Sequence, residues 1–485
     1  MSTGSVVLAR GILRNAGALF LVGMFAKGMG LVIAVLVARF LGTDAMGLFA
    51  LLFSVAMLLE TFISIGMSDS LVRDVAARPR QASNLYLYAL KLVAWISILP
   101  ALALALGAFL IAEDSATRAS LLVVAIGTPV SGAFVVSQAV LQGTERVLLL
   151  IWVTFLARVA SLIWLVVAFY QGAGVEAAFG SRVLFQAASV GVFFFALRRD
   201  RNGESADFTA RHLLTRAAPF ALNRAIGELG ARLPSLVLPG TLGLGASGVF
   251  DTANRVRSTL GMTMSAMIAG MMPSFARQFV DPRGSSDRLV GYSVKYMCLA
   301  ISAVATVIGL GADWIIGLLF GPAFAHASAP LQILAWAQVL VAVDAVLQQV
   351  MLAAGHEYAT VRHSAVGVAG QLVLILLLAS ALDLPGVAVA VLLSAAFTLA
   401  LNLRFVARHV APIPVGQFAA APLAAAGLVA AMMFVVHDQP FLVRVLVLTG
   451  AWGVAAALFR LLPREELRFM RQLASLPRVK HGENP

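Results

Sequence analysis

The sequence predicts an all-α integral membrane protein with about fourteen transmembrane helices, arranged as two parallel six-helix lobes followed by two C-terminal helices. Of its 485 residues, 60% are hydrophobic and 12% are charged, a charged share about half that of a soluble domain. The apolar residues fall into runs long enough to cross a hydrocarbon core of about 30 Å as helices. An internal repeat groups these runs into two sets. A soluble fold is therefore excluded.

Charged or Gly/Pro-rich breaks separate the apolar runs into fourteen spans. The first run follows a short basic start with Arg10 and Arg14. It is too long for the core of a signal peptide, so we expect it to remain as a span, with no removable leader. The predicted spans are 16–41, 46–67, 86–112, 119–142, 148–170, 174–197, 216–239, 246–276, 290–310, 328–353, 364–382, 385–404, 417–436 and 441–461.

Basic residues alternate between the connections. One side of the membrane holds both termini and nearly all of the Lys and Arg in the connections, whereas the other side holds only Arg118 and Arg444. By the positive-inside rule both termini are cytoplasmic, and the even number of spans agrees with this. The net charge of +12 is therefore interpreted as membrane topology and not as nucleic-acid binding.

Several enzyme classes are not supported by the sequence. Its single cysteine, Cys298, cannot form an intramolecular disulfide, and its seven histidines are scattered without metal-ligand spacing. We therefore predict neither catalytic residues nor a metal site. The connections are too short for an extramembrane catalytic domain, and the absence of a GxxxxGK[ST] loop indicates that ATP is not the direct energy source.

Two stretches of the chain repeat one short motif. Residues 41–49 and 242–250 both read LGxxAxGxF. A second match pairs 143–145 with 355–357 and needs a slightly larger shift along the chain. The paired spans enter the membrane from the same side, which indicates two parallel lobes related by an axis along the membrane normal. Chance recurrence of small residues in a chain with 41 glycines is the alternative.

The repeat predicts three parts of the chain. Residues 1–200 form an N-terminal lobe with helices 1–6, and residues 211–410 form a C-terminal lobe with helices 7–12. Residues 415–485 hold helices 13 and 14 and a basic tail. From Pro463 onward this tail has the pattern of a basic amphipathic helix, which we expect to lie on the anionic inner leaflet.

Charged side chains inside the spans cost at least about 2.5 kcal/mol each at mid-membrane, so each needs a partner, water or a function. Arg224, Glu228 and Arg232 in the seventh span are spaced i, i+4 and i+8, on one helical stripe. Asp251 and Arg255 in the eighth span are spaced i and i+4. These two spans are the first hairpin of the second lobe.

The first hairpin of the first lobe carries Lys27 and Glu60, and the eighth span adds Arg257. With five basic and three acidic residues in the two hairpins, we expect a polar, net-cationic cavity between the lobes. Arginine offers paired donors to phosphate oxygens, so this cavity suits a pyrophosphate headgroup. Alternatively, the pairs satisfy one another and only hold the lobes together. The predicted substrate-binding residues are Lys27, Arg224, Arg232 and Arg255.

When the two LGxxAxGxF motifs are superposed, Lys27 coincides with Glu228, which predicts an interlobe ion pair that an anionic substrate breaks. Asp344 and Gln348 in the tenth span, at i and i+4, form either an ion-coupling site or an interhelical hydrogen bond. Buried bases such as Arg158, Arg182 and Lys295 receive no functional role, and the default for His363 is a solvated surface. The predicted gating or ion-coupling residues are Glu60, Glu228, Asp251 and Asp344.

Four stretches carry a family resemblance spread over most of the chain. They read ARFLGTDAMGLFALL in the first hairpin, GVFDTANRVRSTLGMTMSAMIAGMMPSFARQF in the eighth span, LLFGPAFAHASAPLQILAWAQVL at 318–340 and LAAGHEYAT at 352–360. The sequence resembles the Wzx-type polysaccharide and O-antigen repeat-unit flippases of the multidrug/oligosaccharidyl-lipid/polysaccharide (MOP) exporter superfamily, which includes the multidrug MATE transporters.

This resemblance implies alternating-access transport of an undecaprenyl-pyrophosphate-linked oligosaccharide from the cytoplasmic to the outer leaflet of the bacterial inner membrane. It implies no cofactor, and an ion gradient or the membrane potential as the driving force. The expected partners are the lipid-linked substrate, membrane lipids and, as an open alternative, polysaccharide polymerase or assembly proteins; no nucleic acid is expected.

Four other functions compete with this one. Fourteen spans also resemble a lipid II flippase, and a multidrug cation antiporter shares the superfamily, although cationic drugs favour an acidic cavity. A membrane-embedded polysaccharide polymerase or ligase needs a larger outer loop than the sequence offers. A scramblase or assembly factor stays open.

Overall fold

The computed structural model describes residues 3–64, 67–110, 112–198, 218–280, 286–410, 420–436 and 439–458. Within these residues all regular structure is helical, and each of the fourteen predicted spans overlaps a helix or one half of a kinked helix. The all-α membrane fold is therefore confirmed. The helices are α1 (Thr3–Ser64), α2 (Met67–Ala77), η1 (Pro79–Gln81), α3 (Ala82–Leu110), α4 (Ser115–Gly143), α5 (Val147–Tyr170), α6 (Val175–Arg198), α8 (Ala218–Thr241), α9 (Leu244–Val280), α10 (Ser286–Leu310), α11 (Ala312–Leu319), η2 (Pro322–Ala327), α12 (Ser328–Ala353), α13 (Glu357–His409), α14 (Ala421–Val435) and α15 (Phe441–Leu458).

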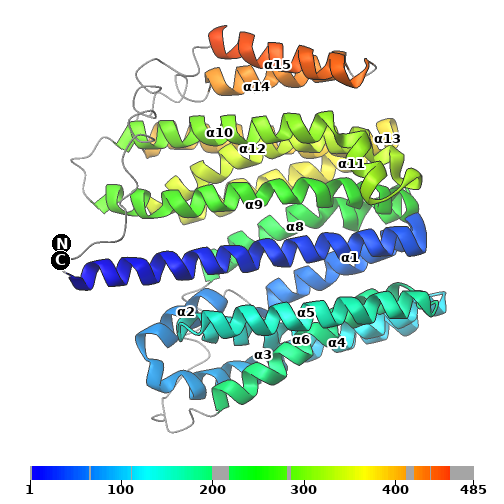
Figure 1. The fold of residues 1–485 in the computed structure, drawn as a ribbon, viewed down its shortest axis with the longest axis vertical. Coiled ribbons are helices and arrows are strands. Elements are labelled where there is room, and N and C mark those ends of the chain that lie inside the picture. The colour runs from blue at the N-terminus through cyan, green and yellow to red at the C-terminus, as the bar shows by residue number, and fades with distance from the viewer. Residues whose placement is uncertain are drawn as a thin grey trace, which may run out of the picture.

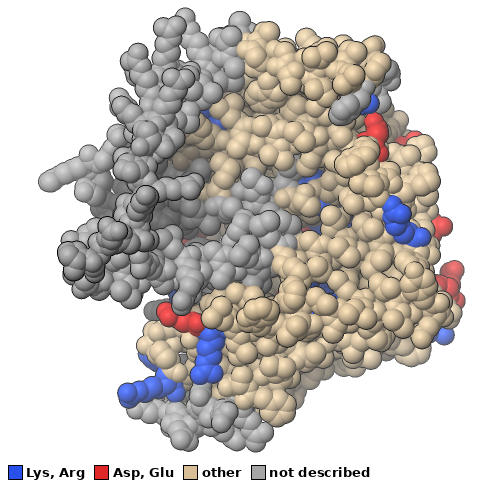
Figure 2. Space-filling view, viewed as in Figure 1, with Lys and Arg blue, Asp and Glu red and all other residues tan. Residues whose placement is uncertain are grey.

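Half of these helical elements can span a membrane. In the described part of the chain, eight are long and apolar enough by length and composition, namely α1, α3, α4, α5, α6, α10, α12 and α13. On the face drawn in Figure 2, charged atoms gather at the two ends of the described surface and are nearly absent from the belt between them. The protein is therefore a multi-pass membrane protein. The long helices α8 and α9 carry the charges described below and are less apolar than these eight helices.

The helices form two bundles on either side of α1 (Figure 1). Helices α2–α6 lie on one side of α1 and α8–α13 on the other, while α14 and α15 pack on each other and on α10. The predicted breaks between the three parts, at 201–210 and 411–414, lie outside the described residues, as does the basic tail from Pro463.

The turns of the two bundles show the repeat. Helix α1 is kinked at Gly42, with φ 85°, and the chain between α8 and α9 turns at Gly243, with φ 88°. Glycine adopts this left-handed conformation without steric cost. The two turns fall at the same position of the two LGxxAxGxF motifs, as the sequence match predicts. We call the end of the bundles that holds these two turns the hairpin end.

The second predicted match, of 143–145 with 355–357, is out of register. In the first bundle the Arg146 N–H donates to the Leu141 carbonyl at 2.9 Å, and in the second bundle the His356 N–H donates to the Met351 carbonyl at 2.8 Å. Because these helix-ending bonds are equivalent, Glu145 corresponds to Gly355 and not to Glu357. The LGxxAxGxF match is long enough to fix its register, whereas a match on one glycine and one glutamate is not.

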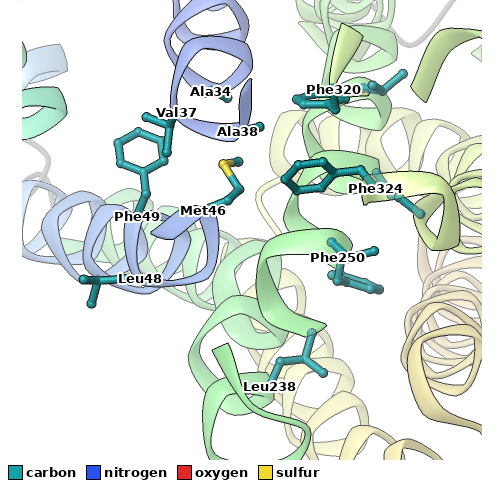
Figure 3. Packing of buried hydrophobic residues seen from close by; sticks show 14 of the residues in the cluster. Ala34, Val37, Ala38, Met46, Leu48, Phe49, Leu238, Phe250, Phe320 and Phe324 are labelled. Carbon is teal, nitrogen blue, oxygen red and sulfur yellow. The ribbon is translucent and has the colours of Figure 1, made fainter. Parts of the chain in front are cut away.

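At the hairpin end the two bundles are closed against each other. Met46 and Ala38 of α1 face Phe320 and Phe324 of the second bundle (Figure 3). All four side chains are buried, as is Phe250 of α9. This apolar seam excludes water between the bundles at that end.

Arg39 adds a polar contact to the same seam. Its side chain donates to the carbonyls of Leu319, at 2.7 Å, and Leu318. These carbonyls end α11 and have no partner within that helix, so a cation from α1 caps the helix C-terminus.

Candidate functional site

Glu60 of α1 and Arg182 of α6 form an ion pair inside the first bundle. The Arg182 Nη2 to Glu60 Oε2 distance is 2.5 Å, and both side chains are less than one-fifth exposed. A second Arg182 nitrogen lies 3.3 Å from the Met57 sulfur. Glu60 was predicted as a gating residue from its own span alone, and the structure shows that its partner comes from a different helix.

The second bundle contributes two pairs, each within one helix. In α9 the Arg255 Nε donates to Asp251 Oδ2 at 2.5 Å, and Asp251 is almost fully buried. In α8 the Arg232 Nε lies 3.5 Å from Glu228 Oε2. The i, i+4 spacing in the sequence thus becomes an ion pair in both helices.

Three arginines from both bundles converge on one aromatic ring. The guanidinium carbons of Arg182, Arg232 and Arg255 lie 5.3, 5.2 and 5.0 Å from the ring centroid of Phe53 in α1. Arg255 also lies 4.9 Å from the Phe49 ring. Cations at these distances are attracted by the ring quadrupole. We call Arg182, Arg232 and Arg255 the arginine cluster.

The arginine cluster is not fully satisfied by its ion pairs. Arg255 Nη2 is buried and has no hydrogen-bond partner, whereas Arg232 Nε and Glu228 Oε2 are buried and lie 3.5 Å apart, too far for a hydrogen bond within their ion pair. Such groups cost about 1–3 kcal/mol each when unsatisfied, so they indicate a place where another molecule completes the hydrogen bonding. With their three acidic partners, these arginines are formally balanced.

Of the two remaining predicted binding residues, Arg224 is not part of the arginine cluster. Arg224 is exposed at the start of α8, and Glu228 pairs with Arg232 instead of with it. The side chain of Lys27 lies outside the described residues, so the predicted Lys27–Glu228 pair stays a prediction. Arg257 turns away from the cluster.

Arg257 points into the second bundle and lines a separate cavity there. It donates to Gln338 of α12 and to Asn254, both at 2.9 Å. The cavity has a volume of about 210 Å³ and is lined by residues of α8, α9, α12 and α13, including Asp344.

Asp344 is buried at the edge of that cavity in a chain of hydrogen bonds. It accepts from Gln348 and from Asn402 of α13, both at 2.7 Å. The Asn402 oxygen is in turn 2.7 Å from Nδ1 of His363, also in α13. Asp344 and Gln348 therefore bond within α12, and the interhelical hydrogen bond of Asp344 goes to Asn402. The expectation of a solvated His363 is wrong, because its ring is buried and hydrogen-bonded.

Sequence reasoning missed Arg182, Phe53, Asn402 and His363 as parts of these sites. Charges within a span were detectable, but only pairs on one helix leave a spacing signal. Arg182 and Glu60 are far apart in the chain, and Phe53 carries no charge. A buried arginine without a partner on its own helix was the available signal for Arg182.

Two helical bundles that meet around buried ion pairs define a multi-pass membrane protein built from two halves. A family model described as "Polysaccharide biosynthesis protein" matches residues 12–279, and the chain belongs to this family. No curated protein sequence matches the chain.

Solved structures share this fold across most of the chain. The lipid II flippase MurJ in an inward closed conformation is 13% identical, with a TM-score of 0.62, and the match covers 94% of this chain and 99% of that one. An inward-facing MATE multidrug transporter of the MOP superfamily is 17% identical, with a TM-score of 0.63, covering 81% and 95%. Its outward-facing counterpart is 16% identical, with a TM-score of 0.63, covering 83% and 96%. The chain therefore has the MOP fold.

Proposed function

We propose that the protein is a flippase that moves an undecaprenyl-pyrophosphate-linked oligosaccharide, a polysaccharide repeat unit of the Wzx or O-antigen kind, across the membrane. The observation that carries the proposal is the convergence of three guanidinium groups from both bundles around Phe53. Family membership and the flippase-like fold agree with it.

The arginine cluster has the chemistry that a diphosphate needs. Guanidinium groups donate paired hydrogen bonds to phosphate oxygens, and these bonds strengthen where water is excluded. The unsatisfied Nη2 of Arg255 supplies a donor from α9, the weakly paired Arg232 supplies a cation from α8, and Arg182 supplies a cation from the first bundle. A diphosphate bound there would replace Glu60 or Glu228 as counter-ion, which is the gating role that we assign to these acids together with Asp251.

The two bundles would move about this site by alternating access. The described conformation is closed at the hairpin end, and the positive-inside rule orients that end toward the outer leaflet, with both termini in the cytoplasm of a bacterial inner membrane. The headgroup would enter from the cytoplasmic leaflet, bind between the bundles and leave when the hairpin end opens. Lys27 and Arg224 would assist at entry, and an ion gradient or the membrane potential would drive the cycle without a cofactor.

A multidrug cation antiporter is the second candidate, because the fold is shared with MATE transporters. It is disfavoured because the three acids of the site are engaged by arginines, which leaves no acidic excess for a cationic drug. A polymerase or ligase would lengthen or transfer the sugar chain, and a scramblase would move unrelated lipids equally well.

Reconstituted vesicles can separate these functions. The purified protein is tested with undecaprenyl-pyrophosphate oligosaccharide, lipid II, undecaprenyl phosphate and a cationic dye, and translocation is read from the access of a membrane-impermeant glycosidase or quencher. We expect transport of the first lipid, loss of transport in Arg232→Gln and Arg255→Gln, and unchanged sugar length. If lipid II is transported in preference to the other lipids, the substrate is lipid II. Transport of the dye, equal movement of all lipids or longer sugar chains would overturn the proposal.

A further inference from the structure

The Asp344–Asn402–His363 chain joins α12 to α13 through one amide group. The Asn402 side-chain nitrogen donates to Asp344 Oδ1, so its oxygen faces Nδ1 of His363. An amide oxygen only accepts, so Nδ1 of His363 must carry a proton in this arrangement. Gln348 donates to the other carboxylate oxygen. Each of these hydrogen bonds fits an ionised Asp344.

Protonation of Asp344 at Oδ1 would reverse this chain. The new O–H must donate, and the nearest group that can accept is the Asn402 amide, once it turns over and presents its oxygen to Asp344. The amide nitrogen then donates to Nδ1 of His363, which must release its proton while Nε2 binds one. The chain gains one proton overall, on Asp344. Its two hydrogen-bond patterns are each complete, so intermediate arrangements leave buried groups unsatisfied.

We propose that Asp344 is the proton-binding site that couples an ion gradient to transport, and that the Asn402 amide turns over when the proton binds. This inference rests on the proposed transport function and names the coupling ion and its site. A metal ion fits less well, because it needs several oxygen ligands. The groups bonded to Asp344 are the donor nitrogens of Asn402 and Gln348. A proton needs only one carboxylate oxygen to bind to and one hydrogen-bond acceptor for the resulting O–H.

The charges around Asp344 agree with a proton. From α9 the facing charge is Arg257, which lines the same cavity but bonds to neutral amides, and no ion pair joins these two described residues. From α13 it is His363. Helix α10 carries the buried Lys295, whose Nζ lies 5.7 Å from the Tyr296 ring centroid. Helix α8 lines the cavity with glycine, alanine and proline only. The described lining of the cavity thus offers a metal cation no carboxylate besides Asp344, whereas a proton needs no second one.

Helix α12 connects this site to the hairpin end. It starts at Ser328, directly after η2, and η2 carries Phe324 of the apolar seam. Asp344 lies about 24 Å from Ser328 along the helix axis. Because α12 is continuous and mostly buried, we expect a rearrangement against α13 at Asp344 to move η2 against α1. The hydrogen-bond pattern that fits an ionised Asp344 is the one present while the hairpin end is closed. Proton binding to Asp344 should therefore favour opening of the hairpin end.

The test measures opening in vesicles that contain no lipid substrate. Met46→Cys, placed in a Cys298→Ala background, reports on the seam through its rate of labelling by a membrane-impermeant maleimide. When the proton affinity of a group differs tenfold between two conformations, their ratio changes about tenfold across the titration. Because maleimide reacts with the thiolate, each rate is divided by the rate measured for a free thiol at the same pH. We expect this ratio to rise about tenfold from about pH 8 to about pH 5. At constant pH and ionic strength, added sodium should have no effect.

Variants of the chain identify the group responsible. Asp344→Asn should abolish the pH response, and Asn402→Leu should abolish it by breaking the link to His363. Two controls should keep it: Ser380→Ala, on an exposed part of α13, and Glu113→Gln, an exposed carboxylate outside the helices. Thermal unfolding checks each variant for folding. If Asn402→Leu does not fold, infrared difference spectra replace it, and the protonated-carboxyl band must appear at low pH and be absent in Asp344→Asn.

The outcomes separate this inference from the proposed function. A pH response that persists in Asp344→Asn, or a sodium response at constant pH, overturns the proton site even if lipid transport is found. A pH response that depends on Asp344 supports the proton site even if no lipid-linked oligosaccharide is moved, in which case only the substrate is wrong.

Discussion

Gly47 and Gly248 lie directly against each other where the two bundles meet at the hairpin end. A Cβ atom on Gly248 would lie 2.7 Å from the backbone nitrogen of Gly47 and 2.2 Å from the Thr43 carbonyl oxygen. The two glycines are equivalent positions of the LGxxAxGxF repeat. Two copies of one motif can touch at equivalent residues only near the axis that relates them, so the closed seam lies on that axis.

A side chain at this crossing should prevent the seam from closing. We expect Gly248→Val to destabilise the closed conformation by about 1–3 kcal/mol through overpacking, and therefore to raise labelling of Met46→Cys by at least fivefold. Gly191→Ala is the control, because its added Cβ meets no atom within 4 Å. Equal labelling rates for the two variants would show that the backbones do not approach each other closely.

The fold could be predicted from the sequence because hydrophobic length and charge asymmetry act locally. Each span is a run of apolar residues, and LGxxAxGxF recurs because both copies need glycine at one turn and one crossing. The weaker match at 143–145 failed because helix-ending turns tolerate different residues. Glu145 and Gly355 hold the same position with φ 59° and 81°.

The site could be predicted only in part. Pairs within α8 and α9 follow from helical spacing, whereas the Glu60–Arg182 pair and the ring of Phe53 depend on how separate helices pack. Packing also decides that Arg257 faces Gln338 and not the cluster. A single sequence holds no record of contacts between helices, so Arg182 received no role.

Breaking the Glu60–Arg182 pair should separate its structural role from its binding role. Arg182→Gln leaves the Glu60 carboxylate partly buried and unpaired, which should cost about 3 kcal/mol of stability. The double variant Glu60→Gln/Arg182→Gln removes both charges and should recover most of that loss in thermal unfolding. Both variants should bind the lipid diphosphate more weakly than the wild type, because both lack the Arg182 guanidinium. Full binding by the double variant would remove Arg182 from the anion site.

Replacing Phe53 should weaken the arginine cluster without removing a charge. Phe53→Leu loses cation–π contacts to three guanidinium groups, about 1 kcal/mol in total, so affinity for a lipid diphosphate should fall about fivefold. Microscale thermophoresis in detergent measures this affinity. Phe109→Leu, on the exposed surface of α3, is the matched control and should bind as the wild type does. An unchanged affinity in Phe53→Leu would show that the ring does not position the arginines.

Asp114 should give the fold an acid-sensitive contribution. It caps α4 by accepting from the Thr117 N–H at 2.9 Å, and hydrogen bonds from Thr117, first its side chain and then its backbone, lower the pKa of Asp114 below its ordinary value. A lowered pKa in the folded state means that the cap stabilises above about pH 4 and that this stabilisation is lost as the pH falls further. Asp114→Ala should cost about 1 kcal/mol at neutral pH. Asp114→Asn should retain the cap and lose the pH dependence, as followed by thermal unfolding.

Arg39 should hold the hairpin end closed from the first bundle. Arg39→Gln loses charge-assisted hydrogen bonds to the carbonyls of Leu318 and Leu319, worth about 1 kcal/mol at this exposed position. Labelling of Met46→Cys should therefore rise about fivefold. Arg118 offers a matched control, since it donates at 3.3 Å to two carbonyls near the end of α3 but stays within one bundle. Arg118→Gln should lower the unfolding temperature without changing the labelling. Of the two arginines, only Arg39 makes hydrogen bonds that cross between the bundles. If both variants raised the labelling rate equally, Arg39 would therefore act through general stability and not by holding the hairpin end closed.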